Sequence, residues 1–436
     1  MSSEIASVEA LRVWDSRGNP TVEVAITTAS GAQGRAIAPA GASRGSREAL
    51  DLRDGGSKLG GMDVRKAVAN VNEVIAPKLI GMDVNDQRGI DDTMIALDGT
   101  PLKSTLGGNA VVASSLAVMH TAAAAEGVPL WAHLAKKYER QPSIPLPEIQ
   151  IFGGGAHASQ RIDIQDFMVM VPGASDFEEV MEVTSEIFRA AGSLMTQRGG
   201  AVGVADEGGW WPSFQTNEEG LELLVEAIEL AGETPGDRVV ISLDIAASEF
   251  ASNGKYRLGL EDRDLSSDQM IALLGKWIDT YPIASIEDPL DEDDREGTIA
   301  FTQEFGDRIQ IIGDDYITTS ETMLRKAAGE GACNAVLVKV NQAGTVSEML
   351  DTFMAAEDLG YRNVISARSG ETEDVSITHM SAGLGGGQLK VGSFTRSERM
   401  VKWNECLRLQ NAPGMGGFAA GESLANTWWG KKGQQR

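Results

Sequence analysis

Four apolar runs in the second half of the chain each end in one charged residue. They are VVISLD, PIASIE, IQIIGD and AVLVK, and they end at Asp244, Glu287, Asp314 and Lys339. Short continuous runs of Val, Ile and Leu separated by amphipathic stretches are typical of buried parallel strands. Folds built from such strands place ligands and chemistry at the strand ends. The pattern therefore predicts that three carboxylates and one lysine converge.

Strand-like and helix-like segments, including the strand-like GAVGVADEGG at 200–209, alternate over residues 149–410. This alternation predicts an α/β protein with a C-terminal (β/α)8-type barrel, and an open doubly wound sheet is the alternative. Two pairs, Thr216 with Glu219 and Ser266 with Gln269, have the spacing of a capping box at a helix start.

The first 138 residues have a different pattern. TVEVAIT at 21–27 alternates in polarity and predicts a small antiparallel meander, whereas 109–127 is apolar nearly all round and predicts a buried helix. We therefore expect an α+β domain over 1–138. Three prolines mark a connector at 139–148, because proline discourages helix. A tail over 411–436 shows no clear periodicity.

Composition excludes several classes of function. A net charge of −25 opposes binding to nucleic acid, whose affinity comes largely from Lys and Arg on phosphates. No apolar stretch approaches the roughly 20 residues that span a bilayer, and the N-terminus lacks a secretory signal. Cys333 and Cys406 form no disulfide framework and are expected to be reduced. These observations predict a cytoplasmic protein that binds neither membrane nor nucleic acid.

Asp244, Glu287 and Asp314 are candidate metal ligands. Carboxylates gathered at one barrel mouth raise one another's pKa, and a hard divalent cation relieves that repulsion. Oxygen ligands without cysteine indicate magnesium or manganese and not zinc. The alternative is that each carboxylate forms a structural salt bridge or a helix cap.

Lys339 is a candidate general base beside this metal site. An unperturbed lysine has a pKa near ~10.4, but burial and neighbouring cations favour its neutral form. A neutral lysine here removes a proton α to a substrate carboxylate, and metal ions stabilise the negative charge that results. The alternative is that Lys339 only pairs with the acids.

Anion-binding residues follow the remaining strand-like runs. Arg368 and Ser369 follow NVIS, and Lys390 ends QLK, so a doubly anionic substrate is expected. The loop PAGASRGSRE at 39–48 is rich in Gly, Ala and Ser and suits closure over a phosphate and a metal. It lacks the ending of a Walker A motif, so an ordinary surface loop is the alternative.

A series of motifs resembles the enolases, the phosphopyruvate hydratases of glycolysis, up to about residue 410. The matching strings are DSRGNPTVEV, GASRG, GGAHA, DEGG, LDIAASEF, IEDPLDEDD, GDDY, LVKVNQAGT, RSGETED and LKVGSFTRSER. The resemblance implies an N-terminal capping domain, a barrel that begins with two antiparallel strands, and a homodimer or higher oligomer. It also implies two magnesium ions and dehydration of 2-phosphoglycerate, or a related 2-phospho-hydroxy acid, through an enediolate.

The same resemblance implies a role for each matching residue. The first magnesium is implied at Asp244, Glu287 and Asp314, and the second at Ser43. Lys339 corresponds to the base and Glu207, in DEGG, to the acid that assists departure of hydroxide. The substrate-binding residues implied are Arg368 and Ser369 for phosphate, Lys390 for carboxylate, and His157 of the GGAHA loop.

The chain departs from the usual enolase pattern around the substrate. Ala367 replaces the histidine of SHRSGET, Arg44 and Arg47 are additional cations in the loop, Asp166 replaces a glutamate, and Gly153 replaces an asparagine. Asp166, Arg44 and Arg47 are therefore further candidate substrate contacts. Loss of an imidazole makes room, and added arginines favour additional negative charge.

Three other hypotheses about function remain beside ordinary enolase activity. The first is a paralogue with a larger or more anionic substrate, which would resemble carboxyphosphonoenolpyruvate synthase. The second is an isomerase or racemase, against which the retained Glu207 argues. The third is a binding protein with a decayed site, against which the intact Asp244, Glu287, Asp314 and Lys339 argue.

Overall fold

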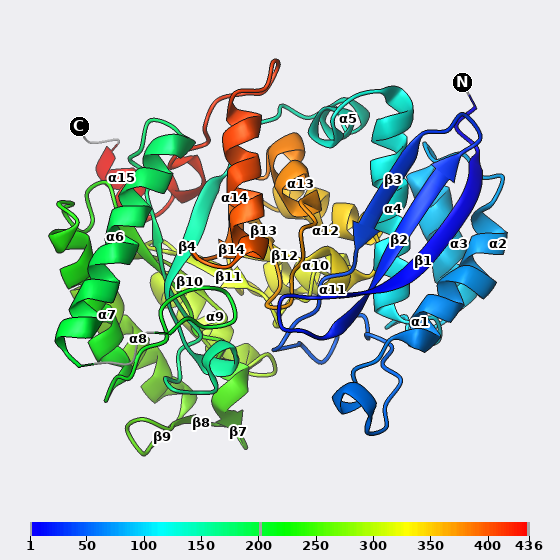
Figure 1. Cartoon of the computed structure of the whole chain (residues 1–436). Coiled ribbons are helices and arrows are strands. Elements are labelled where there is room, and N and C mark those ends of the chain that lie inside the picture. Colours follow the sequence, from blue (N-terminus) through cyan, green and yellow to red (C-terminus); the bar gives the residue numbers. More distant parts are fainter. Residues whose placement is uncertain (1, 200–202, 434–436) are drawn as a thin grey trace.

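The computed structural model describes residues 2–199 and 203–433 of the chain. It consists of a small sheet with helices at the N-terminal side and a closed barrel surrounded by helices (Figure 1). The predicted fold class is confirmed. The barrel is closed by parallel pairing of the strand Ile283–Glu287 with the strand Val240–Asp244, so the open doubly wound alternative is wrong.

The N-terminal part begins with the predicted antiparallel meander. Its strands pair in chain order and are β1 (Ile5–Trp14), β2 (Pro20–Thr28) and β3 (Gln33–Ile37). Its helices are α1 (Arg65–Asn70), α2 (Ala76–Leu79), α3 (Gln87–Asp98), α4 (Gly108–Glu126) and α5 (Leu130–Lys137), with a π-helical segment, η2 (Val71–Ile75), between α1 and α2. Helix α4 is buried along most of its length, packs on β2 and β3, and ends at Gly127 in the left-handed region. This confirms the buried helix expected at 109–127.

The barrel contains eight strands in the order β10-β11-β12-β13-β14-β4-β5-β6. They are β4 (Leu146–Gly153), β5 (Asp166–Met170), β6 (Val240–Asp244), β10 (Ile283–Glu287), β11 (Gln310–Gly313), β12 (Ala335–Val338), β13 (Arg362–Ser366) and β14 (Gln388–Gly392). Only β5 runs antiparallel to its neighbours β4 and β6. The other strands therefore end at one common mouth, as expected for the residues that follow them.

Helices cover the outside of the barrel. They are α6 (Phe177–Gln197), α7 (Asn217–Leu230), α8 (Ser267–Thr280), α9 (Arg295–Phe305), α10 (Glu321–Glu330), α11 (Val340–Ala343), α12 (Val346–Asp358), α13 (Ser376–Leu384) and α14 (Ser397–Gln410). Ser266 and Gln269 form the complete capping box that the sequence predicts. At the start of α7 only one of the two capping-box hydrogen bonds forms, from the Glu219 amide to Thr216 Oγ1. The Glu219 side chain accepts from the Gln215 amide and not from the Thr216 amide.

The strand-like segment 200–209 is not a barrel strand over its described residues, 203–209. Val204 pairs with Trp210 in an isolated bridge, and Glu207 lies in the intervening loop. Residues 200–202 lie outside the described part of the chain.

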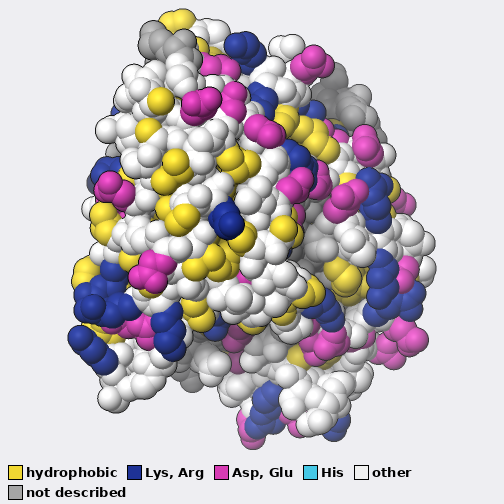
Figure 2. Space-filling model, turned by 90° about the vertical axis from the view of Figure 1, so that its right-hand side faces the viewer, with side chains coloured by type: hydrophobic (Ala, Val, Ile, Leu, Met, Phe, Trp, Pro, Cys, Tyr) yellow, Lys and Arg dark blue, Asp and Glu magenta, His cyan; other side chains and the backbone are white. Residues whose placement is uncertain are grey.

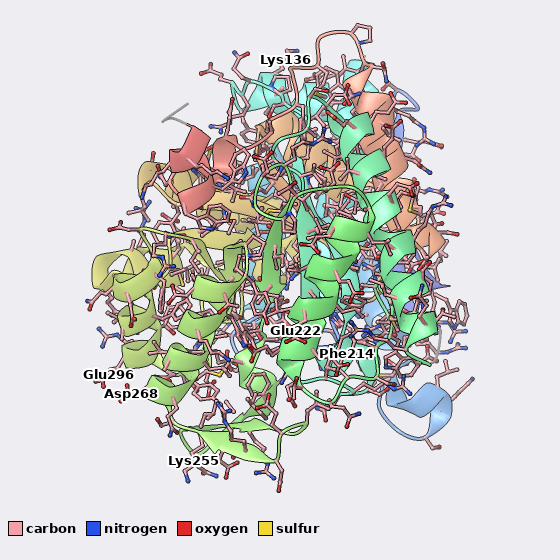
Figure 3. All side chains as sticks on the ribbon, turned by 90° about the vertical axis from the view of Figure 1, so that its left-hand side faces the viewer. Lys136, Phe214, Glu222, Lys255, Asp268 and Glu296 are labelled. Atoms are coloured by element: carbon pink, nitrogen blue, oxygen red, sulfur yellow. The ribbon has the colours of Figure 1, made fainter. Side chains whose placement is uncertain are left out.

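Several short elements complete the fold. The N-terminal part contains the 3-10 turn η1 (Lys58–Gly61). The barrel part contains the antiparallel sheet β7 (Ala251–Ser252), β8 (Lys255–Leu258) and β9 (Arg263–Leu265), with the 3-10 turns η3 (Gly155–Ala158) and η4 (Ala247–Phe250), and the tail contains η5 (Glu422–Leu424). Lys255, at the tip of this sheet, lies at the same end of the barrel as Asp268 and Glu296, in the first turns of α8 and α9 (Figure 3). Acidic side chains in these first turns suit the positive end of the helix dipole.

The C-terminal tail closes the opposite end of the barrel (Figure 1). Leu424 packs with Leu146, Met170, Val240 and Ala284, which lie at the strand ends farthest from the mouth. After it, α15 (Trp428–Gly433) contributes two indoles, whose N–H groups donate to the carbonyls of Ile283 and Asp237. The segment without periodicity is thus an ordered plug over its described residues.

The domain boundaries stay a prediction. Helix α5 ends at Lys137, one residue before the predicted end of the first domain, and α14 ends at Gln410, where the tail was expected to begin. Strand β4 starts at Leu146, inside the expected connector 139–148.

Figure 2 shows the face of the molecule on which the N-terminal part lies. Charged side chains of both signs are spread there among small hydrophobic patches. Across the described residues, no single helix has the length and apolar character to cross a membrane; α4 with α5 passes by length and composition only as a pair bent by 92°.

The plug predicts a measurable contribution to stability. Leu424→Ala should cost about 2–5 kcal/mol, because its fully buried side chain closes the floor of the barrel. Leu230→Ala is the matched control, since Leu230 is 57% exposed, and should change stability by less than about 0.5 kcal/mol. Urea unfolding midpoints measure both. Equal midpoints for the two variants would show that the tail does not support the barrel.

Candidate active site

The four charged residues at the ends of apolar runs do meet at the barrel mouth. Asp244 and Glu287 end β6 and β10, Asp314 follows β11, and Lys339 follows β12. Lys390 Nζ lies 2.7 Å from Asp244 Oδ2 and 2.8 Å from Glu287 Oε2. Lys339 Nζ donates to Asp314 Oδ2. Two ammonium groups therefore lie among the three predicted metal-ligating carboxylates.

The protonation of this cluster follows from burial and from its ion pairs. Burial, with repulsion from Asp244, raises the pKa of Glu287 well above its usual range. Burial also opposes ionisation of Asp314, but Lys339 lowers the pKa of Asp314 overall. Burial likewise acts to lower the pKa of Lys339, yet Asp314 raises it. Lys339 and Asp314 therefore form an ion pair in this arrangement.

The donor set fits a hard divalent cation. Glu287 Oε1, Asp166 Oδ2 and Gln165 Oε1 are buried without a hydrogen-bond partner in the described part of the chain. Unpaired buried oxygens are costly, and carboxylate and amide oxygens are ligands that Mg²⁺ prefers. Over residues 2–199 and 203–433, two groups of His, Asp or Glu side chains have ligand atoms within 4.8 Å of one another: His157, Asp166, Glu207 and Asp288, Asp314, Asp315. Of the predicted trio, Asp314 belongs to the second group, whereas Asp244 and Glu287 belong to neither.

Three polar residues that sequence reasoning missed hold these carboxylates. Asp288 accepts hydrogen bonds from the backbone amides of Asp314 and Asp315, at 2.9 and 2.7 Å, and fixes the turn after β11. Gln342 donates to Asp314 Oδ1 and Gln165 to Asp244 Oδ2. Asp288 directly follows Glu287 in IEDP, and this adjacency was the available signal.

The predicted acid lies on the other side of the mouth. Glu207 is 6% exposed, and its Oε1 lies 3.9 Å from His157 Nε2. His157 Nδ1 lies 3.4 Å from Asp166 Oδ1. Burial acts to lower the pKa of His157, but Glu207 and Asp166 raise it. An imidazolium is thus favoured between the two carboxylates, and the pKa of Asp166 falls to about 2 in spite of burial, chiefly through His157.

Arg368 and Ser369 are held from the N-terminal part. Glu48 accepts from both terminal nitrogens of Arg368, at 3.0 and 3.3 Å, and the Ser43 carbonyl accepts from Arg368 Nη2 at 3.0 Å. Ser369 Oγ accepts from the Ala42 amide at 2.6 Å. The loop at 39–48 is therefore packed onto the anion-binding pair and is not a free surface loop.

Two further arginines support this pair and were missed, although they occur in quoted motifs. Arg17, in DSRGNPTVEV, donates to Ser369 Oγ at 3.2 Å and to the Ala40 carbonyl at 2.9 Å. Arg399, in TRSER, is fully buried and donates to the backbone carbonyls of Arg368 and Ser369.

One narrow cavity joins the two sides of the mouth. Its lining comprises Gly41, Ala42, Ser43, His157, Gln165, Glu207, Asp244, Lys339, Ser366, Ala367, Arg368, Ser369 and Lys390. The candidate base, acid and anion-binding groups thus face a shared space. Among the departures, Ala367 lines it.

The two loop arginines lie outside this cavity. Arg47 pairs with Glu292 and Asp293 on the outer side of the loop. Arg44 is exposed and does not line the cavity. The expected contact of Arg44 and Arg47 with substrate has no support in this arrangement, because the carboxylates of the β10–α9 loop attract Arg47 away.

Comparison with known proteins identifies the family of the chain. Residues 5–134 match the family described as "Enolase, N-terminal domain", and residues 141–427 match "Enolase, C-terminal TIM barrel domain". The protein named Enolase 1 from Desulfitobacterium hafniense (strain Y51) is 48% identical over 427 residues, covering 96% of this chain and 97% of its own length. The chain therefore belongs to the enolase family and is a hydro-lyase.

Proposed function

We propose that the protein is a magnesium-dependent enolase that dehydrates 2-phosphoglycerate, or a closely related 2-phospho-3-hydroxy acid, to an enolpyruvate. The observation that carries this proposal is the shared cavity, which is lined by Lys339, Glu207 and the anion-binding Arg368, Ser369 and Lys390. A base, an acid and cationic groups around one space suit removal of a C2 proton and of a C3 hydroxyl.

Each group has a distinct task in this reaction. Lys339 removes the C2 proton, and Glu207, which has to be protonated for this step, donates a proton to the C3 hydroxyl, which leaves as water. Asp244, Glu287 and Asp314 would hold one Mg²⁺ and Ser43 a second. When bound, the ions would supply positive charge that stabilises the negative charge developing on the substrate. Lys339 has to lose its proton before it acts. The carboxylate that stabilises its protonated form is Asp314, a proposed metal ligand.

His157, Asp166 and Lys390 complete the proposed substrate contacts. His157 and Lys390 line the cavity. Asp166 does not line it, but its Oδ2 lies 3.5 Å from Lys390 Nζ. We also infer a homodimer or higher homo-oligomer, a cytoplasmic location, and no nucleic-acid or membrane partner. The support for these inferences is family membership and the net charge of −25.

A larger or more anionic substrate, as in a carboxyphosphonoenolpyruvate synthase-like enzyme, is the second candidate. The small Ala367 side chain in the cavity wall favours it. The outward pairing of Arg47 and the exposure of Arg44 do not favour a more anionic substrate. We therefore keep 2-phosphoglycerate as the first substrate to test.

The first test is enolpyruvate formation, followed at 240 nm with Mg²⁺ and 2-phosphoglycerate. The wild type should turn over, and a chelator should abolish turnover. Lys339→Ala and Glu207→Gln should each lose about 10²–10⁴-fold in kcat. Lys276→Ala, on an exposed lysine that pairs with Glu218, is the control and should keep full activity. A wild type that is inactive with Mg²⁺ would refute the proposed substrate.

Ala367→His separates the two candidate substrates. If the native substrate is larger, narrowing the cavity should raise kcat/KM for 2-phosphoglycerate by about tenfold or more. On our proposal the variant shows no gain over the wild type, because the wild-type cavity already suits 2-phosphoglycerate. Ala367→Leu is the control for added bulk without an imidazole. A clear gain specific to Ala367→His would favour the larger substrate.

The buried pair that closes the loop predicts an effect on stability. Glu48→Gln should destabilise the protein by about 3–5 kcal/mol, because it leaves the buried Arg368 without its carboxylate. Asp293→Asn weakens an exposed contact with Arg47 of the same loop and should cost about 0–1 kcal/mol. Thermal or urea unfolding compares the two. Equal costs would mean that Glu48 does not anchor the loop.

A further inference from the structure

The side chain of Gln150, which lies outside the cavity, connects Asp166 with the loop that carries Glu207. Gln150 is fully buried on β4. Its Nε2 donates to Asp166 Oδ1, and its Oε1 accepts from the Gly209 amide at 2.8 Å. Gly209 is two residues from Glu207, the proposed proton donor. A single amide therefore connects Asp166 on β5 with the loop that carries Glu207.

The packing around Gln150 leaves room for this amide. A Cβ at Gly209 would lie 2.3 Å from Gln150 Oε1, so a side chain at 209 is incompatible with the hydrogen bond. A Cβ at Gly153 would lie 3.2 Å from Gln150 Nε2 and 2.6 Å from Ala205 Cβ. Ala205 in turn pairs its amide with the Gly209 carbonyl at 2.8 Å. The two glycines thus admit the amide and the loop together.

These contacts form a closed ring, which we call the Gln150 ring. It runs from Gln150 to Asp166, from Asp166 to His157, from His157 to Glu207, and back through Gly209. The ring directs Asp166 Oδ1 toward Gln150 and His157 and leaves Oδ2 toward Lys390. Gln150 itself does not line the cavity, so it acts only through its neighbours.

We propose that Gln150 is a positioning residue that holds Glu207 in place for proton donation to the leaving hydroxyl. This inference rests on the proposed function. Lys339 follows β12, which is separated from β4 by β13 and β14 in the barrel, and its Nζ donates to Asp314, which is not part of the ring. Loss of Gln150 therefore impairs elimination and spares removal of the C2 proton.

The ring also gives a physical reason for two departures from the enolase pattern. Asp166 is shorter than the usual glutamate, and the long side chain of Gln150 reaches it across the gap between β4 and β5. Gly153 lacks the usual asparagine side chain, and the space beside its Cα is taken by Gln150 and Ala205. The two substitutions and Gln150 thus act as one set.

The test separates the two half-reactions in Gln150→Leu. Elimination is followed at 240 nm, and C2 proton removal by deuterium exchange from solvent into 2-phosphoglycerate, detected by NMR. Elimination should fall about 100-fold, since small misplacements of a catalytic group cost that much. Exchange should stay within about threefold of the wild type.

Gln310→Leu is the matched control. Gln310 is another buried glutamine of the barrel interior and is hydrogen-bonded to Gln388 and Ser285, away from the ring. This variant should preserve the wild-type ratio of exchange to elimination even where it lowers stability. If Gln150→Leu fails to fold, Gln150→Met replaces it, because it keeps the length of the side chain but loses both the donor to Asp166 and the acceptor for Gly209.

The outcomes distinguish failure of the positioning role of Gln150 from failure of the proposed function. If exchange and elimination fall together in the Gln150 variants, or if neither changes, Gln150 has no positioning role. If the wild type itself neither exchanges nor eliminates, the proposed function is wrong and the positioning role falls with it. Only selective loss of elimination, absent from the Gln310 control, supports the proposal.

Discussion

The electrostatic balance at the barrel mouth is the constraint on which the rest of the site depends. Three carboxylates at strand ends repel one another, and Lys339 and Lys390 supply the compensating charge. Such a buried cluster is held only where every surrounding polar group is oriented. Asp288, Gln165 and Gln342 provide that orientation from neighbouring strands and turns. Oxygens without partners, such as Glu287 Oε1, mark where a cation would add to this balance.

The active site also depends on both parts of the chain. The barrel supplies Arg368 and Ser369, while the N-terminal part supplies Glu48, Arg17 and the Ala42 amide that hold them. A residue of the loop and a residue of the barrel thus form a buried ion pair. The position of this loop therefore determines the surroundings of the anion-binding arginine.

Much of the fold could be predicted from the sequence because its signals are local. Apolar runs that end in charge predicted β6, β10, β11 and β12 and the convergence of their end residues. The capping box at Ser266 is likewise encoded within four residues. The closure of the barrel and the rearranged cap at Thr216 required the three-dimensional partners.

The supporting residues of the site could not be predicted in the same way. Glu48 and Arg368 are 320 positions apart in sequence, and nothing beside either residue indicates the other. The direction of Arg47 depends on carboxylates that only the folded β10–α9 loop brings near. Gln150 lies inside an apolar strand, where a polar residue signals a buried partner but does not identify it.

The plug at the floor of the barrel has a consequence for association between copies of the chain. All eight barrel strands and α14 precede Leu424 and the two indoles in sequence, so the strands themselves do not cover this floor. Without the plug, Leu146, Met170, Val240 and Ala284 would form an uncovered apolar floor. Exposed apolar surface of this kind favours association with other chains. The plug thus protects the barrel from aggregation at that end.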